Sequence, residues 1–277
     1  MKQNKIKVKD FFISNELPFT LIAGPCAMES EEHSLMLADA IQNICTKLGI
    51  NYVFKASFDK ANRMSIKSGR GIGIDKSLPV FKKIKEKIGC AVLTDFHERE
   101  QFKHEVANVV DIIQTPAFLC RQTDLLVDAA KVGKPINIKK GQFMAPWDMV
   151  NLVNKVLEQG NDQIMLCDRG TSFGYNTLVS DATGLAIMAE QTGCPIVIDA
   201  THSIQKPGGL GNKSGGNREL AKIVARSGIA VGISAVFLEV HQDPDTAPSD
   251  GPNMVKLENL EEILKHLVGI DKVIKNY

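Results

Sequence analysis

Residues 52–63 read Tyr-Val-Phe-Lys-Ala-Ser-Phe-Asp-Lys-Ala-Asn-Arg, an apolar β-like run that leads directly into a loop with three cations. The cations Lys55, Lys60 and Arg63 are interspersed with small and polar residues. Cations at the end of a buried strand are costly to desolvate unless an anion pairs with them. A solvated basic loop is the ordinary alternative for such a charge run. Because strand-end loops of α/β proteins carry sites disproportionately, we favour a surface that binds an anionic ligand.

The same boundary between an apolar run and a polar loop recurs along the whole chain. Short β-branched runs alternate with amphipathic stretches at spacings of roughly 20 to 40 residues, as in strand–helix units. The predicted strands are 20–23, 52–55, 91–94, 109–114, 136–139, 163–167, 195–199 and 235–240, and the predicted helices are 35–48, 80–88, 124–132, 148–159, 220–226 and 257–275. Helices are expected to end at Gly49, Gly89, Gly133, Gly160, Gly193 and Gly228.

About eight strand–helix units predict an α/β fold, namely a TIM (β/α)8 barrel of about 250 residues. Alternation alone does not show closure, so a doubly wound open sheet is the alternative. We expect one domain over residues 1–277. Residues 1–18 precede the first barrel strand and are expected to form a β-hairpin over the barrel bottom.

Composition narrows the class of protein. The 277 residues include 33 Lys and Arg against 32 Asp and Glu, and a net charge of +1 gives no reason to expect nucleic acid or an anionic membrane as partner. No apolar run approaches the ~20 residues of a membrane span, and the first residues lack the apolar region of a signal peptide. The six cysteines form no C-x-x-C pair and are expected to be reduced thiols. We therefore expect a cytoplasmic protein.

Polar, charged or thiol side chains stand at all eight predicted strand ends, where barrels keep their sites. One chemical group among them is cationic and consists of Lys55, Lys60, Arg63, Lys139 and Arg169. Five cations at one mouth would repel one another unless phosphate or carboxylate groups neutralise them, which suggests more than one bound anionic group. For Lys139 and Arg169 singly, a carboxylate of the chain itself is the ordinary alternative partner.

A second chemical group consists of Cys26, His202, Glu239 and Asp250. A thiolate, an imidazole and two carboxylates suit one divalent ion, and the mixed donors leave Zn²⁺, Fe²⁺ and Mn²⁺ open. No local spacing marks the set. A buried free cysteine more often packs as a small hydrophobe, and a single histidine is more often hydrogen-bonded or an acid–base group.

The glycine-rich segment 207–216, Pro-Gly-Gly-Leu-Gly-Asn-Lys-Ser-Gly-Gly, resembles a nucleotide loop only superficially. A Walker motif requires glycine directly before Lys213, where this chain has Asn212. No G-x-G-x-x-G follows the first strand, which argues against a dinucleotide cofactor. Five glycines in ten residues instead predict a mobile loop after His202 that covers the mouth.

With these residues in view, the chain closely resembles the 3-deoxy-D-manno-octulosonate 8-phosphate synthase family over nearly its whole length. The motifs that carry the resemblance are 21–26 (Leu-Ile-Ala-Gly-Pro-Cys), 54–63, 94–98 (Thr-Asp-Phe-His-Glu), 114–118, 121–124, 137–143, 169–175, 199–202 (Asp-Ala-Thr-His) and 249–250. The resemblance implies a homotetrameric barrel that condenses phosphoenolpyruvate with D-arabinose 5-phosphate and water, releasing inorganic phosphate, in lipopolysaccharide biosynthesis.

The resemblance also assigns residues. Phosphoenolpyruvate would be held by Lys55, Ser57, Gln114, Lys139 and Arg169. The sugar phosphate would be held by Lys60, Asn62 and Arg63, with Arg63 reaching a neighbouring subunit's site. Catalysis would involve His202 beside phosphoenolpyruvate, Asp95 near the reacting end of the sugar, Lys55 and Asp250.

The family has metal-dependent and metal-independent branches, which differ by Cys or Asn at the position of Cys26. This chain resembles the metal-dependent branch, with Cys26, His202, Glu239 and Asp250 as ligands of a divalent ion. One departure from the family pattern is Met64, where serine is usual; Ser65 supplies a hydroxyl one position later.

The alternative activity is that of 3-deoxy-D-arabino-heptulosonate 7-phosphate synthase, which uses erythrose 4-phosphate. Its matching phrase reads Lys-Pro-Arg-Thr-Ser, where residues 60–63 here read Lys-Ala-Asn-Arg. Sialic acid synthases use an unphosphorylated sugar, which fits the number of cations poorly. From a different class, a sugar-phosphate-binding barrel without turnover is disfavoured by the intact set of ligand and cation positions.

Overall fold

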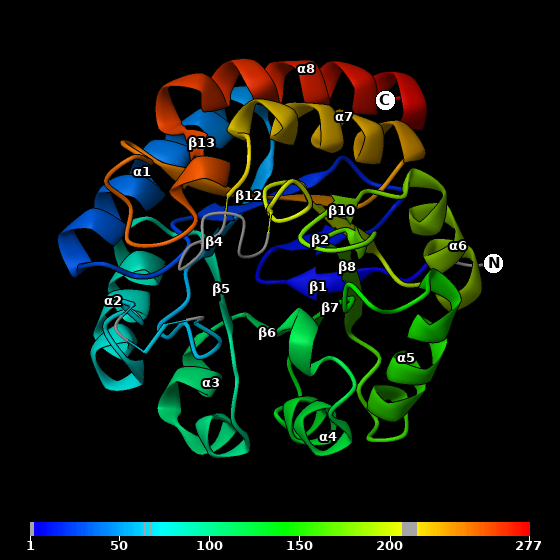
Figure 1. The fold of residues 1–277 in the computed structure, drawn as a ribbon, viewed down its shortest axis with the longest axis horizontal. Helices are drawn as coiled ribbons and strands as arrows, with labels where there is room; N and C mark the ends of the chain where they lie inside the picture. Colours follow the sequence, from blue (N-terminus) through cyan, green and yellow to red (C-terminus); the bar gives the residue numbers. More distant parts are fainter. Residues whose placement is uncertain (1–2, 64, 67, 207–214) are drawn as a thin grey trace.

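The computed structural model shows a closed barrel of eight parallel strands (Figure 1). It describes residues 3–63, 65–66, 68–206 and 215–277. The barrel strands are β3 (Thr20–Gly24), β4 (Asn51–Lys55), β5 (Ala91–Asp95), β6 (Ile112–Thr115), β7 (Ile136–Lys139), β8 (Ile164–Asp168), β11 (Ile196–Asp199) and β12 (Ala235–His241). They pair in this order, and β12 returns to β3 with Glu239 opposite Gly24. The closure confirms the barrel over the open sheet.

Helices surround the barrel and bury their apolar faces against its outward-facing strand residues (Figure 1). They are α1 (Glu31–Leu48), α2 (Ile74–Lys87), α3 (Glu105–Val109), α4 (Thr123–Lys131), α5 (Met149–Leu157), α6 (Ala182–Thr192), α7 (Ala221–Val231) and α8 (Leu257–Lys275). Short 3-10 helices are η1 (Arg99–Lys103), η2 (Ala117–Leu119), η3 (Pro146–Asp148), η4 (Arg218–Leu220) and η5 (Gly251–Asn253), and short strands are β9 (Thr171–Ser172), β10 (Leu178–Val179) and β13 (Val255–Lys256). Among the described helices, none combines the length and apolar character that crossing a membrane requires.

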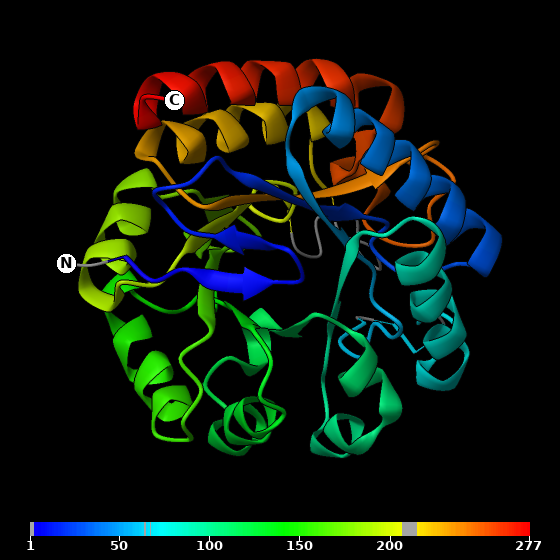
Figure 2. The same ribbon diagram turned by 180° about the vertical axis from the view of Figure 1, so that it is seen from behind.

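The N-terminal strands β1 (Ile6–Val8) and β2 (Phe11–Ile13) form an antiparallel hairpin. Figure 2 shows this hairpin lying across one open end of the barrel. The buried side chains of Ile6, Val8 and Ile13 pack with inward-facing barrel residues, several of which begin their strands. The predicted hairpin over the barrel bottom is therefore confirmed, and its apolar side chains fill the end opposite the functional mouth.

Three details differ from the sequence-based expectations. The predicted strand 109–114 begins only at Ile112, because Val109 ends the short helix α3. Helices α3 and α6 were not predicted, since α3 has only five residues and since Gly184 and a weak polar–apolar alternation obscure the periodicity of α6. Gly228 does not end α7 but lies within it, and Gly232 caps the helix instead. A Cβ at Gly228 would lie 2.7 Å from Ile198 Cγ2, so the close packing of α7 against β11 requires glycine at this position.

Two sequence-based expectations fall on residues that the structure does not describe. These residues are Met64 and 207–214, which make up most of the predicted lid.

Close approach of two backbones fixes the identity of Gly24. A Cβ at this position would lie 2.1 Å from the Lys55 carbonyl oxygen, so it could be accommodated only by moving the strand end that carries Lys55. We expect Gly24→Ala to lower the free energy of unfolding by about 1–3 kcal/mol, the usual cost of overpacking.

Gly269→Ala in α8 is the matched control for this substitution. Nothing lies within 4 Å of its added Cβ, so replacing a helical glycine should stabilise the protein by about 0.5–1 kcal/mol. Denaturant unfolding measures both variants, and wild-type stability of Gly24→Ala would contradict the close approach.

Candidate active site

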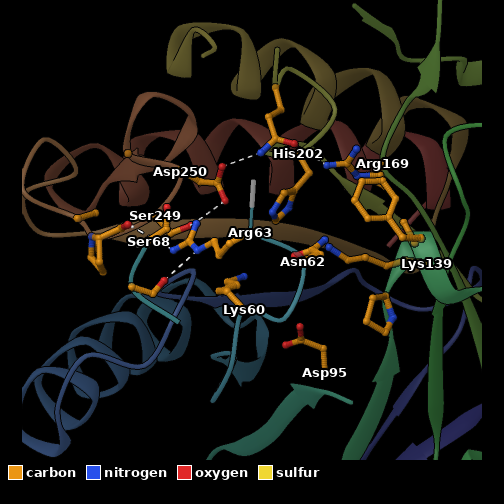
Figure 3. A pocket seen from close by; sticks show the side chains of 18 of the residues that line it. Lys60, Asn62, Arg63, Ser68, Asp95, Lys139, Arg169, His202, Ser249 and Asp250 are labelled. Atoms are coloured by element: carbon orange, nitrogen blue, oxygen red, sulfur yellow. Dashed lines mark hydrogen bonds between the residues drawn. The ribbon is translucent and has the colours of Figure 1, made fainter. Parts of the chain in front are cut away.

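The carboxyl ends of the barrel strands surround a cavity of about 900 Å³. Figure 3 shows cationic and acidic side chains from different elements converging on it. The sequence-predicted residues that line the cavity are Lys55, Lys60, Asn62, Arg63, Asp95, Gln114, Lys139, Arg169, His202 and Asp250. The remaining three, Cys26, Ser57 and Glu239, are buried and contact residues of this lining. The structure thus brings every predicted site residue to one mouth.

The four predicted metal ligands lie together beneath this mouth. Donor atoms of Cys26, His202, Glu239 and Asp250 are all within 4.8 Å of one another. The Cys26 sulfur lies 3.3 Å from Asp250 Oδ2, and His202 Nε2 lies 3.4 Å from Glu239 Oε1. Barrel closure explains the meeting, because β12 pairs with β3 and so places Glu239 beside the segment that carries Cys26.

The donor set fits a divalent ion on its own chemistry. Glu239 Oε1 faces Lys55 Nζ at 3.3 Å, but Oε2 is buried and has no hydrogen-bond partner among the described residues. A buried carboxylate oxygen without a partner is costly, and a cation would compensate it. Sulfur, imidazole and carboxylate donors in one cluster are typical of sites for zinc and other divalent transition metals.

A second group, Glu29, His33 and His241, also brings its donor atoms within 4.8 Å. His241 Nδ1 accepts the backbone N–H of Asp243, so in the neutral ring Nε2 carries the proton and donates to Glu29 Oε1 at 2.9 Å. Metal binding at that nitrogen would leave Nδ1–H facing another N–H. The contacts within this group are therefore explained by hydrogen bonding, without a metal ion.

Asp199, the last residue of β11, organises the site, although it was noted beforehand only as part of a motif. Its Oδ2 accepts from Lys139 Nζ and from His202 Nδ1, the latter at 2.6 Å. Burial alone would raise the pKa of this carboxyl, but His202 and Lys139 hold the pKa of Asp199 well below its usual range. Asp199 therefore orients His202 with Nε2 towards Glu239, as carboxylates do for metal-binding histidines. The sequence could have indicated this role, because Asp199 stands three residues before His202.

Asp95 forms a second buried anionic point at the mouth. Ser57 Oγ donates to it at 2.5 Å, and His97 Nε2 lies 3.2 Å from its other oxygen. Burial would raise the pKa of Asp95, but the hydrogen bond and charge of His97, with Lys55, hold it well below the usual range. An ionised carboxylate is thus present at the cavity, where it can accept a hydrogen bond from a ligand. His97, which also lines the cavity, had not been singled out from the sequence.

Arg169 provides an open anion-binding position. It is buried at the end of β8, and its Nη2 donates to Gln205 Oε1 at 2.8 Å. Its Nη1 is also buried but finds no acceptor in the parts of the chain that the structure describes. A buried guanidinium N–H without an acceptor is energetically costly. A phosphate or carboxylate oxygen of a ligand would supply the missing acceptor.

Arg63 lines the cavity of its own chain rather than projecting away from it (Figure 3). It donates to Ser249 Oγ at 2.7 Å and to the Gly69 carbonyl at 2.9 Å. The contact with Ser249 holds the loop after β4 against the loop after β12, and the contact with Gly69 lies within the loop after β4. Arg63 lines the same cavity as Lys60 and Asn62 of its own chain, and its reach to a neighbouring subunit's site stays a prediction.

Comparison with known proteins agrees with this geometry. The sequence model of the DAHP synthetase I family matches residues 3–276. The 2-dehydro-3-deoxyphosphooctonate aldolase of Bartonella quintana is 54% identical over 270 residues, covering 98% of this chain and 96% of that protein. Proteins of the same name are 55% identical over 261 residues in Rhodopseudomonas palustris, covering 94% and 91%, and 53% identical over 272 residues in Brucella anthropi, covering 98% of each.

We expect Asp199→Asn to weaken binding of a divalent ion by about 10- to 100-fold, because His202 loses the partner that orients it. The variant should also be less stable, since Lys139 loses a buried counter-charge. Asp271→Asn is the control: Asp271 is equally buried in α8 and accepts from the backbone N–H of Phe19, far from the cluster. Both variants should unfold more easily, but only Asp199→Asn should lose affinity in a Mn²⁺ titration. Equal metal affinity of the two would contradict this role.

Cys26 gives the site a pH dependence. Burial and the nearby Glu239 raise the pKa of the Cys26 thiol, so it is protonated at neutral pH in the metal-free protein. A metal-bound cysteine is a thiolate, so binding must release this proton and metal affinity should rise with pH.

Calorimetric titration of Zn²⁺ in buffers of different ionisation enthalpy counts the protons released. We expect wild type to release about one more proton per ion near pH 7 than Cys26→Ala does. Cys45→Ala, which changes a buried cysteine of α1 outside the cluster, should behave as wild type. Equal proton release by wild type and Cys26→Ala would exclude Cys26 as a ligand.

Proposed function

The chain belongs to the DAHP synthetase I family, and we propose that it condenses phosphoenolpyruvate with D-arabinose 5-phosphate and water to give 3-deoxy-D-manno-octulosonate 8-phosphate and inorganic phosphate. Its relatives at 53%, 54% and 55% identity are named 2-dehydro-3-deoxyphosphooctonate aldolase, another name for this synthase. One structural observation supports the proposal most directly. At the same mouth, Arg169 Nη1 is a buried donor without an acceptor and Glu239 Oε2 is a buried acceptor without a donor among the described residues.

Phosphoenolpyruvate binds, in this proposal, against the strand ends of β4, β6, β7 and β8. Arg169 offers its open Nη1 to an anionic oxygen, and Lys139 lies in the same cavity wall. Gln114 is oriented by Asn137, whose amide donates to its Oε1 at 3.0 Å, so the Gln114 N–H group remains as a donor to the ligand. Lys55 and Ser57 complete the set from β4 and the loop that follows it, and all five side chains are nearly buried.

The sugar phosphate binds at the outer part of the cavity. Lys60, Asn62 and Arg63 lie on one loop after β4 and face the cavity (Figure 3). Asp95 lies deeper, as an ionised carboxylate that accepts a hydrogen bond from a hydroxyl near the aldehyde end. The phosphate end and the reacting end of the sugar are therefore recognised by groups of opposite charge, which fixes its direction in the site.

The chemistry joins C3 of phosphoenolpyruvate to C1 of the sugar. The π electrons of the enol form the new C–C bond, and the aldehyde oxygen becomes a hydroxyl. Water adds at C2 and its proton ends on the former aldehyde oxygen, and the resulting hemiketal phosphate releases inorganic phosphate by C–O cleavage as the C2 hydroxyl loses its proton and becomes a carbonyl. Arg169 and Lys139 stabilise the charge on phosphate and carboxylate throughout, as preorganised cations do in a buried site. Asp199 holds His202 through Nδ1, and in this proposal His202 lies beside the reacting end of phosphoenolpyruvate.

A divalent ion would be held by Cys26, His202, Glu239 and Asp250, and Zn²⁺, Fe²⁺ and Mn²⁺ all suit this donor set. When bound, it supplies Lewis-acid polarisation of the sugar carbonyl. Burial alone would raise the pKa of Asp250, but His202 and Lys60 lower it to about 2, so this ligand is ionised at neutral pH.

The assembled form proposed for the chain is a homotetramer. Large apolar side chains that the isolated chain exposes by more than half support it, because such groups commonly mark protein interfaces. They include Phe118, Phe143, Trp147, Phe173 and Tyr175 on the loops after β6, β7 and β8. Light scattering of the purified protein measures the assembled mass, and a monomer would overturn this assignment.

The direct test is phosphate release from phosphoenolpyruvate with arabinose 5-phosphate, with erythrose 4-phosphate or without sugar. We expect turnover with arabinose 5-phosphate and at least about 100-fold less with erythrose 4-phosphate, because a misplaced reacting carbon forfeits much of the gain from positioning. Chelation should abolish turnover, and a divalent ion should restore it. Turnover only with erythrose 4-phosphate would contradict the assignment of arabinose 5-phosphate as substrate. Full activity after thorough chelation would contradict the requirement for a metal ion.

A further inference from the structure

A glutamine that belongs to neither the substrate set nor the ligand set joins the two. Gln205 follows His202 in the loop after β11 and lines the cavity. Its Oε1 accepts from Arg169 Nη2 at 2.8 Å, and its Nε2 donates to Asp250 Oδ1 at 2.6 Å. One side chain therefore connects the guanidinium proposed to bind phosphoenolpyruvate with a carboxylate proposed to bind metal.

The two partners fix the orientation of this amide. Arginine can only donate and an ionised carboxylate can only accept, so the oxygen of Gln205 must face Arg169 and its nitrogen must face Asp250. A rotation by half a turn would set N–H against N–H and oxygen against oxygen. Only one orientation of the Gln205 amide therefore forms both hydrogen bonds. A movement of Arg169 displaces Gln205 and hence Asp250, and the reverse also holds.

Asp250 is the ligand that most needs such a support. Glu239 is carried by strand β12, and His202 is fixed by Asp199. Asp250 instead lies in a loop with left-handed backbone geometry, φ 53°, which is uncommon for a residue other than glycine. Its Oδ2 accepts from Cys26 and Ser249, while Oδ1 is held by Gln205.

We propose that Gln205 is a positioning residue that couples binding of phosphoenolpyruvate at Arg169 to binding of the divalent ion at Asp250. An anion on Arg169 Nη1 fixes the guanidinium, which holds Gln205 and in turn keeps Asp250 Oδ2 aimed at the cluster. By linkage, each ligand then tightens the binding of the other by the same factor. The inference rests on the proposed function, because it takes phosphoenolpyruvate as the anion.

The buried Asp199 forms a second connection, from Lys139 to His202. Both of its contacts are direct and lie on a strand end, so they are expected to remain formed whether or not ligand is bound. The Gln205 bridge spans two loops and ends on the ligand held least by the barrel. We therefore expect it to carry most of the coupling.

The test measures Mn²⁺ affinity of the chelator-treated full-length protein, by the electron paramagnetic resonance signal of free Mn²⁺, with and without phosphoenolpyruvate. The variants are Gln205→Met, which keeps the shape and removes both hydrogen bonds, and Gln205→Glu, which keeps the acceptor for Arg169 but has no donor for Asp250. Gln242→Met is the matched control, since Gln242 is exposed and contacts His33 rather than the bridge.

For wild type we expect phosphoenolpyruvate to lower the Mn²⁺ dissociation constant on the order of 10-fold, within the usual range of coupling between sites. This ratio should fall below about 3 in both Gln205 variants and stay near 10 in Gln242→Met. A ratio unchanged in the Gln205 variants would overturn the inference. So would a wild type that binds both ligands independently, which leaves the proposed function intact. Failure of wild type to bind phosphoenolpyruvate at all would overturn both.

Discussion

Charge compensation inside a closed barrel is the constraint on which this site depends. Closure buries the ends of eight strands around one mouth, and a buried charge is tolerated only when an opposite charge or several hydrogen bonds accompany it. Glu239 meets this need for Lys55, and Asp199 meets it for Lys139 while its Oδ2 also accepts a hydrogen bond from His202 Nδ1. The buried charges of the mouth thus form a network of ion pairs and hydrogen bonds, in which each side chain is held by its neighbours.

Two charged groups in the described part of the mouth are incompletely compensated, and they indicate what the site binds. Glu239 Oε2 lacks a cation and Arg169 Nη1 lacks an anion among the described residues, although both atoms are buried. The first lies in a cluster with sulfur and imidazole donors, which suits a metal ion, and the second lies in a cavity large enough for two small phosphorylated substrates. Gln205 connects the two positions through Asp250, so that the site can sense both ligands together.

The sequence predicted the barrel because strand–helix alternation is local, and it predicted which strand ends carry reactive side chains. It overestimated the free positive charge of the mouth. The carboxylates of Glu239 and Asp199 pair with Lys55 and Lys139, and pairing between residues 184 and 60 positions apart in the sequence is set by tertiary structure. For the same reason Asp199 and Gln205 were not singled out, since neither has a local pattern that reveals its partners. The unpredicted helix α6 and the misjudged Gly228 likewise reflect packing against other elements rather than local preference.

The most direct measurement is anomalous X-ray diffraction at the Mn²⁺ edge from crystals grown with Mn²⁺ and phosphoenolpyruvate. The account predicts one strong anomalous peak within bonding distance of Cys26 Sγ, His202 Nε2, Glu239 and Asp250, with an oxygen of phosphoenolpyruvate on Arg169 Nη1. A peak at Glu29, His33 and His241 instead, or a ligand that leaves Arg169 Nη1 without an acceptor, would contradict it.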